Sequence, residues 1–303
     1  MSILTSGTWP RLLLPGIRTV FGEDFKRREK IHEKIFELRT SDKHEETDVE
    51  LYGTGVATVM GEGAPVGTDN IGQGLIQRYN HVQYGKSLVI TKIAIEDNLY
   101  RSHISRMAPE ISKSIVEAME VEGANILNRA FNNSYTYADG QPLCDTDKVV
   151  SRTGSTFANK PATASDLSEL SLENAFHDIA AIVGSDGLRA KLEVKKLIIP
   201  EALRFDAARL TMSDLKTSSA DNDINTIKAM SLIPETVVWH YLTDNDAWFL
   251  LTDCPDGLIK YTRRPVSIDS DNEFTTDNMV FKGTTRFSFG SSNQRCIYGN
   301  AGA

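Results

Sequence analysis

The most regular hydrophobic pattern of the chain lies between Pro109 and Phe131. Apolar residues recur there at helical spacing in two adjacent rows, while Glu and Lys occupy the opposite face. Pro109 suits the first turn of a helix, because its missing N–H would have no partner there. The pattern predicts a helix roughly 35 Å long at about 1.5 Å per residue. The two rows are Ile111, Ile115, Met119, Ile126 and Ala130, and Val116, Gly123, Leu127 and Phe131.

A weaker helical pattern precedes this segment, over residues 21–40. Acidic residues interleave there with Lys and Arg, so we interpret the charged side as a solvated helix face rather than a DNA-binding surface. Residues 1–20 show no regular pattern and are expected to form an irregular arm. The apolar positions of the second segment are Phe21, Phe25, Ile31, Ile35 and Leu38.

Residues 48–90 are polar and rich in glycine. Their two ends, 49–59 and 75–84, suit strands, and the middle suits a wide turn, so we expect a long hairpin that projects from the body. Ordering about forty residues costs roughly 40–80 kcal/mol of backbone entropy. Offsetting that cost needs roughly 2,000 Å² of apolar burial, which this segment cannot supply by itself. We therefore expect it to lie on a neighbouring subunit.

The second half mixes helices and strands without a repeating βαβ unit, which predicts an α+β fold. Ser171 is the expected N-cap of a helix whose stripe runs from Leu172 to Val183. Residues 193–200 read as a buried strand, and Pro200 is expected to open a short helix. A β-hairpin is expected around the turn 243–246. Polar and apolar residues alternate over residues 281–289, which predicts a strand with one buried face.

Composition narrows the class of protein. The net charge is −8, which argues against a nucleic-acid reader with a broad basic face and against a polybasic membrane binder. The three cysteines are far apart and odd in number, so neither a disulfide framework nor a zinc cluster is expected. A reduced, cytosolic site of maturation fits this usage.

Searches for catalytic motifs are negative. The pair His44–Glu45 begins like a metalloprotease motif, but Asp48 stands where the second histidine is needed. The acidic clusters at 221–223 and 269–273 resemble calcium loops in composition only and are interpreted as solvated loops. Cys144 is expected to be a small buried apolar residue. We therefore predict no catalytic, cofactor-binding or metal-binding residue and no enzymatic activity, although an enzyme with a wholly non-local site remains an alternative.

Several segments, taken in order, resemble the major capsid (coat) protein of tailed bacteriophages, which has the Hong Kong-97 capsid fold. The resemblance covers nearly the whole chain, and the order of the segments makes it specific. It implies an N-terminal arm, an extended β-hairpin loop, a peripheral domain with a long spine helix and an axial domain. The segments are 90–100, 128–133, 139–147, 195–210, 248–268 and 286–299.

The resemblance also implies domain boundaries. The arm would span 1–47, the extended loop 48–90, the peripheral domain 91–165 and the axial domain 166–268. C-terminal strands in 269–303 would return to the peripheral domain. Because the chain starts almost directly at the arm, the scaffolding function is expected to reside in a separate protein, unless the sequence is an already processed product.

The function implied by the resemblance is structural. The protein would assemble with itself into hexamers and pentamers of an icosahedral phage head that encloses double-stranded DNA. Expected partners are a scaffolding protein, a portal and decoration proteins, with no membrane and no cofactor. The location would be the virion, after assembly in the host cytoplasm. The nearest alternative is an encapsulin-like shell that encloses protein cargo.

Within the extended loop, three charged residues are expected to contact the neighbouring subunit: Glu62 and Asp69 near the tip, and Arg78 on the returning strand. The Lys–Asn cross-link of one branch of the family is not expected, because Lys86 lies at the root of the loop.

Overall fold

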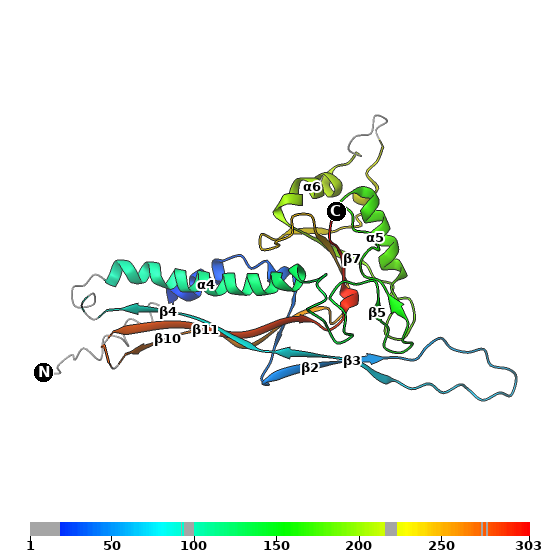
Figure 1. Cartoon of the computed structure of the whole chain (residues 1–303), viewed down its shortest axis with the longest axis horizontal. Helices are drawn as coiled ribbons and strands as arrows, with labels where there is room; N and C mark the ends of the chain where they lie inside the picture. Colours follow the sequence, from blue (N-terminus) through cyan, green and yellow to red (C-terminus); the bar gives the residue numbers. More distant parts are fainter. Residues whose placement is uncertain (1–18, 92, 94–99, 216–222, 274, 277) are drawn as a thin grey trace.

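The computed structural model describes residues 19–91, 93, 100–215, 223–273, 275–276 and 278–303. It shows an elongated body in which a long helix covers a sheet, a second part beside it that contains the C-terminus, and a thin loop that projects from the body (Figure 1). Helices and strands are mixed, so the predicted α+β class is confirmed. The predicted irregular arm lies almost entirely outside the described residues. No helix in the described ranges is long and apolar enough to cross a bilayer.

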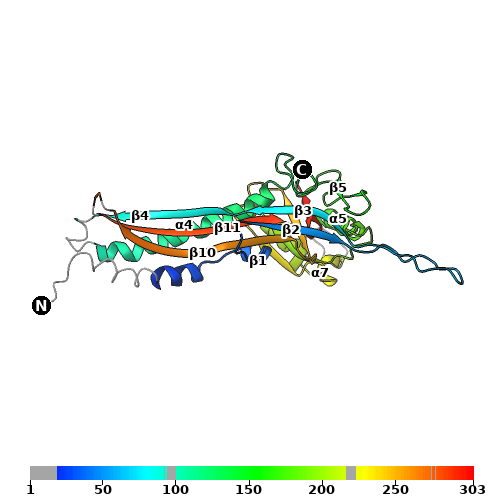
Figure 2. The same cartoon turned by 90° about the horizontal axis from the view of Figure 1, so that it is seen from below.

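The long helix, α4 (Tyr100–Asn128), lies along a sheet of strand order β1-β10-β11-β4 (Figures 1 and 2). The helix begins nine residues before Pro109, so the prediction that Pro109 opens it is wrong. A proline inside a helix removes one N–H donor. Packing of α4 along β4 and β11 outweighs that loss. The carbonyl of Pro109 also accepts a hydrogen bond from Arg28 Nη2 at 3.2 Å.

The helix and the sheet share an apolar core. Ile111, Ile115 and Met119 of α4 are at most 3% exposed and pack with Phe281 and Phe287 of β11. The strand predicted over 281–289 is thereby confirmed as part of β11. A Cβ atom on residue 283, which is glycine, would lie 2.6 Å from Ile111 Cγ2, so glycine permits the close approach. The remaining strands of this sheet are β1 (Glu37–Thr40), β4 (Val82–Ile90), β10 (Leu258–Asn272) and β11 (Met279–Ser291).

The single helix predicted over 21–40 is wrong. Residues 19–27 are helical, α2 (His32–Ile35) is one short turn, and β1 then pairs in parallel with β10. Phe36 explains the break, because its side chain, 3% exposed, enters the core. Its ring lies 4.9 Å from that of Phe289, which the backbone reaches only by leaving the helix. Leu38, expected on the buried stripe, is half exposed as a result.

A second sheet, of strand order β12-β9-β7-β8, lies beside the first (Figure 1). The buried strand expected over 193–200 is β7 (Val194–Ile199). It pairs in parallel with β8 and antiparallel with β9, so β8 and β9 do not form the hairpin expected around 243–246. Trp239 lies in the connection from β8 to β9, which passes from one side of β7 to the other, and its side chain is fully buried. The other strands are β8 (Glu235–Val238), β9 (Trp248–Thr252) and β12 (Ile297–Asn300).

Helix α5 (Glu169–Ala181) covers the second sheet (Figure 1). Its N-cap is Ser168 rather than Ser171, because the two serines form a reciprocal capping box in which each backbone N–H donates to the other side chain. Leu172 and Ile179 are buried as expected from the stripe. Pro200 precedes a short helical segment, also as expected. The remaining elements are β5 (Lys148–Val149), β6 (Thr156–Phe157), η2 (Glu201–Leu203), α6 (Arg204–Met212), α7 (Thr226–Ala229) and η3 (Gln294–Cys296).

The projecting loop consists of β2 (Glu45–Tyr52), β3 (Gly72–Asn80) and the extended residues 53–71 between them. The strands are antiparallel, with Glu45 opposite Asn80 and Tyr52 opposite Gly72. The first strand ends at Tyr52 instead of residue 59. Residues 82–90, which we had included in the extended loop, form β4 and pair with β11 in the first sheet. The segment between the two strands extends away from the body as a thin ribbon (Figures 1 and 2).

Candidate functional site

The outer part of the projecting loop carries exposed apolar side chains. Val59 is fully exposed, and Val56 and Val66 are each more than 70% exposed, as is Ile71 next to the start of β3. Met60 is 51% exposed. Soluble monomeric proteins rarely expose a run of this kind unless it binds something. The loop is therefore the first candidate for a contact surface.

The root of the projecting loop is tied to the body by Arg152, which lies in a turn between β5 and β6. Its Nη1 donates to the carbonyl of Gly53 at 2.8 Å, and its Nη2 pairs with Asp69. Asp69 also accepts from the backbone N–H groups of Gly55 (3.1 Å) and Asn70 (2.9 Å). The hydrogen bond from Arg152 lowers the pKa of Asp69 below its ordinary value. Both strands leaving the body are thus held by one guanidinium group.

A second tie lies closer to the body, at Glu50 of β2. Ser151 donates a short hydrogen bond to Glu50, and Arg295 Nη1 donates to the other carboxylate oxygen at 2.9 Å. Arg295 is 5% exposed, and its Nε donates to the carbonyl of Val183 at 2.7 Å. This largely buried, hydrogen-bonded ion pair joins β2 to η3, and Ser151 joins β2 to the segment after β5.

The third tie involves Asp48, also on β2. Its carboxylate accepts hydrogen bonds from Ser292 Oγ at 2.6 Å and from Tyr261 Oη at 2.9 Å. The ring of Tyr79, on β3, packs 4.9 Å from that of Tyr261. A Cβ atom at Gly290 would lie 2.5 Å from Tyr79 Cε1, so glycine is needed for this close contact. Three contacts spaced along the strands thus make the root of the loop rigid.

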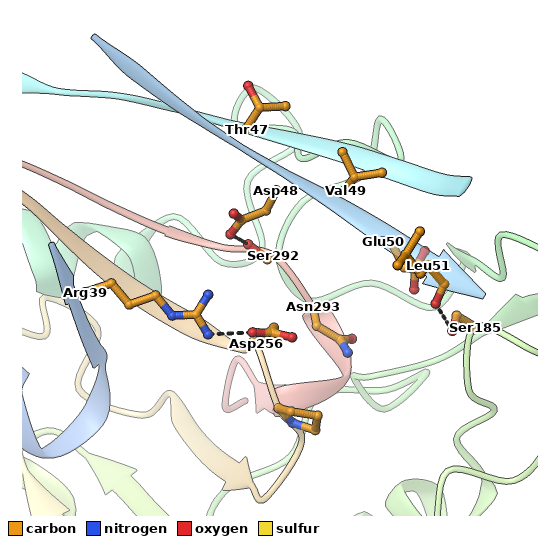
Figure 3. Close-up of a pocket in the computed structure, with 11 residues that line it drawn as sticks. Arg39, Thr47, Asp48, Val49, Glu50, Leu51, Ser185, Asp256, Ser292 and Asn293 are labelled. Atoms are coloured by element: carbon orange, nitrogen blue, oxygen red, sulfur yellow. Dashed lines mark hydrogen bonds and ion pairs between the residues drawn. The ribbon is translucent and has the colours of Figure 1, made fainter. Parts of the chain in front are cut away.

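An open cleft of about 560 Å³ lies between β2 and the turn that follows β9 (Figure 3). On one wall, Arg39 Nη2 donates to Asp256 Oδ1 at 2.5 Å. On the other, Val49 and Leu51 are 40% and 64% exposed. The β2 wall is mixed, because Thr47, Asp48 and Glu50 line the cleft beside these two apolar residues. The lining residues are Arg39, Thr47, Asp48, Val49, Glu50, Leu51, Ser185, Pro255, Asp256, Ser292 and Asn293.

The three charged residues expected to meet a neighbouring subunit lie in different settings. Glu62 is exposed near the far end of the projecting loop, and Arg78 is exposed on β3. Asp69 lies at the root rather than near the tip, and it is paired with Arg152 of the same chain. Sequence analysis missed Arg152 and Glu50. The only local signal was the alternation of Asp48 and Glu50 on one face of a strand.

The described residues offer little chemistry. No group of three His, Cys, Asp or Glu side chains within the described ranges could hold a metal ion. Cys144 is fully buried, and burial raises the pKa of its thiol to about 12. Burial likewise raises the pKa of Cys254 to about 11. His240 is mostly exposed and lies 3.4 Å from Glu201. Residues 221 and 222 of one acidic cluster lie outside the described residues.

The sequence matches the family described as "Phage capsid protein" over residues 76–300. A comparison with curated proteins finds no match. Among solved structures, the fold is similar to the virus-like particle from Pyrococcus furiosus, with 10% identity, a TM-score of 0.56, and coverage of 94% of this chain and 98% of that chain.

The capsid of Cyanophage P-SCSP1u is similar at 11% identity and a TM-score of 0.57, covering 91% of this chain and 89% of that one. A structure from Mycobacterium phage Bobi has 10% identity and a TM-score of 0.56, with coverage of 91% and 90%. At these identities the likeness concerns the fold, which is of the Hong Kong-97 type.

Proposed function

Because the chain belongs to the phage capsid protein family, which its match over three quarters of the sequence shows, we propose that it assembles with itself into hexamers and pentamers of a closed icosahedral shell around double-stranded DNA. In this proposal α4 and its sheet form the peripheral domain, and the sheet of β7, β8, β9 and β12 forms the axial domain. The role is structural and needs no catalytic residue.

The observation that carries the proposal is the contrast within the projecting loop. Its root is fixed by charged contacts, of which the pair Arg295–Glu50 is largely buried, whereas its outer part exposes Val56, Val59 and Val66 to solvent. A rigid root and an apolar outer part suit a segment that reaches over a neighbouring copy and buries its side chains there. Glu62 and Arg78 are the charged groups that we place at the rim of that contact.

The second exposed apolar area lies on the axial part, around α6 and α7. Each of its residues is at least 46% exposed, so several copies meeting around a symmetry axis would bury them together. This arrangement supplies a contact within a hexamer or pentamer that is independent of the projecting loop. The residues are Phe205, Met212, Leu215, Ile224 and Met230.

The acidic balance of the chain suits a DNA container. A net charge of −8 provides no broad basic surface, and such a surface would hold the packaged phosphates tightly. A motor and portal, a scaffolding protein and decoration proteins are the proposed partners, with assembly in the host cytoplasm and the virion as the final location.

The test is to replace residues 54–70 with Gly-Ser-Gly and to express the variant beside the wild type. We expect native-like circular dichroism and cooperative melting, since the body has its own cores, together with sedimentation as a monomer or small oligomer. Thr58→Ser, a mild change in the same loop, serves as the control and should still assemble. Closed particles from the deletion variant, or loss of its folded state, would contradict the proposal.

The alternative shell, which encloses protein cargo, is tested on the wild-type particles. After nuclease treatment, protected DNA inside the particles supports the phage head. A co-purifying protein in place of DNA supports the compartment. A monomer with enzymatic turnover and no particles would favour neither.

A further inference from the structure

Three ionisable side chains from three different elements meet inside the protein. They are His32 of α2, Glu120 of α4 and Lys260 of β10, and they are 0%, 4% and 5% exposed. Burying charges in this way is unfavourable unless each finds a partner. The cluster lies apart from the projecting loop, and the assembly proposal does not use it.

The geometry fixes which atoms carry protons. His32 Nδ1 lies 2.7 Å from Glu120 Oε1, and His32 Nε2 lies 2.7 Å from Lys260 Nζ. A carboxylate can only accept, so Nδ1 carries the hydrogen and donates to Glu120. In the neutral ring Nε2 then has a free lone pair, which accepts from the Lys260 ammonium. The neutral imidazole thus separates one positive from one negative group.

Glu120 also joins three parts of the fold. Its carboxylate accepts from the backbone N–H of His32 at 3.3 Å and from Trp239 Nε1, beyond the end of β8, at 2.9 Å. Glu120 is therefore one of the groups that attach the arm segment, which we define as residues 28–36, to α4 and to the axial part. Arg28 also donates to the carbonyl of Pro109 in α4, and the carbonyl of Lys34 accepts from Lys196 of β7. His32 is the only described side chain that contacts both Glu120 and Lys260.

The other groups around the cluster are two opposite charges, which offset each other, and aromatic rings. Lys30 and Glu33 of the arm segment act on the cluster from a distance, and Tyr241 faces Glu120. From β11, the rings of Phe287 and Phe289 lie 5.7 and 5.6 Å from Lys260 Nζ. A proton added at His32 Nε2 would meet the ammonium at hydrogen-bond distance, with no lone pair between them.

We propose that His32, Glu120 and Lys260 form a proton-sensitive lock, in which protonation of His32 breaks the contact with Lys260 and frees the arm segment from α4. Burial, opposed by the hydrogen bond to Glu120 and assisted by the charge of Lys260, lowers the pKa of His32 below its ordinary value. The pKa of this histidine is lower in the closed state than its ordinary value of about 6.5. Its contribution to the stability of the closed state is therefore complete at pH values above about 6.5. That stabilisation is lost as the pH falls from there toward the lowered value.

Hydrogen exchange of the full-length chain tests the lock. We expect the protection factor of the arm segment, corrected for the intrinsic exchange rate at each pH, to fall about tenfold per pH unit below pH 6.5, as uptake of one proton requires. His32→Asn keeps a donor toward Glu120 but does not titrate, so its protection should not depend on pH. His240→Asn, at an exposed histidine, is the matched control and should retain the wild-type slope. Equal slopes in the wild type and His32→Asn, or no slope in the wild type, would overturn the proposal.

A second variant keeps the test decisive if His32→Asn does not fold. Lys260→Met removes the cation and leaves an apolar side chain among the phenylalanine rings. His32 can then take up a proton and form an ion pair with Glu120, so protection of the arm segment should hold or rise as the pH falls. If the wild-type decrease persists in this variant, Lys260 has no part in the lock and the proposal fails.

Discussion

Two valines of the projecting loop provide a direct measure of what the loop contributes to assembly. Val59 is 100% exposed and Val66 is 72% exposed in the isolated chain. Changing both to serine should leave the free energy of unfolding of the monomer within about 0.5 kcal/mol of the wild type, because neither side chain contributes to a core.

In the assembled shell the expected effect is much larger. Full burial of a valine is worth about 1.5–3 kcal/mol, so two valines that are exposed to this extent would lose about 3–5 kcal/mol for each docked loop. Each 1.4 kcal/mol is roughly a factor of ten in an association constant. The contact between neighbouring copies should therefore weaken by roughly two to four powers of ten.

Light scattering and analytical ultracentrifugation over a concentration series would measure the threshold for assembly, and thermal melting of the same samples would measure monomer stability. The double variant Val59→Ile and Val66→Ile keeps the apolar character and should assemble as the wild type does. Assembly of the serine variant at the wild-type threshold would refute the argument that these side chains are buried between copies. A large drop in melting temperature would instead show that they pack within the monomer.

Three further predictions concern the body, and a fourth concerns the assembled particle. Leu127→Ala, at a position of α4 that is 1% exposed, should lower the free energy of unfolding by about 2–5 kcal/mol in urea titrations; a loss below 1 kcal/mol would contradict the packing. Ser168→Ala removes the N-cap of α5 and should cost about 0.5–2 kcal/mol in thermal melts, whereas an unchanged melt would reject the capping box. Because burial raises the pKa of Cys144 to about 12, iodoacetamide at pH 8 should label it only after unfolding. Denaturing gels of particles without reductant should show one band near 33.6 kDa, and a ladder of heavier species would reveal covalent links between copies.

Local patterns predicted the elements whose partners are close in sequence or whose burial is one-sided. The alternation around Phe281 and Phe287 identified β11, and the apolar residues 197–199 before Pro200 identified β7. Pro200 correctly marked the start of a helical segment. For β11 the alternation itself reports which side of the strand faces the core.

Tertiary contacts decided the elements that the patterns missed. Nothing near Phe36 indicates that its ring will insert beside Phe289, more than 250 residues away, so a broken helix looked continuous. Two strands separated by a short turn looked like a hairpin until β7 took the place between them. Pro109 looked like a helix start because the support that α4 receives from β4 and β11 is not visible locally.

The projecting loop was predictable only in part. Its location in a glycine-rich segment followed from composition, whereas its contact with a neighbouring copy is a proposal that rests on the entropy argument. The ties at its root did not follow from composition, since Arg152 is 83 residues from Asp69 and Arg295 is 245 residues from Glu50. Asp69 lies three residues before the start of β3, so it is at the root of the loop, where it pairs with Arg152 of the same chain.

The order of the strands has a consequence for how the chain is made. The apolar face of α4 is covered by β11, which ends at Ser291, and β12 completes the second sheet only at residues 297–300. At about 5–20 residues per second, roughly 10–30 s separate synthesis of the helix from synthesis of its cover. During that interval Ile111, Ile115 and Met119 can pack only on elements made earlier, such as β4, and lack the cover of Phe281 and Phe287. Exposed apolar surface of this kind in a partly folded chain promotes aggregation. A chain truncated before β11 should aggregate. Neither sheet is complete until synthesis is almost finished, which delays any association between copies until the protein leaves the ribosome.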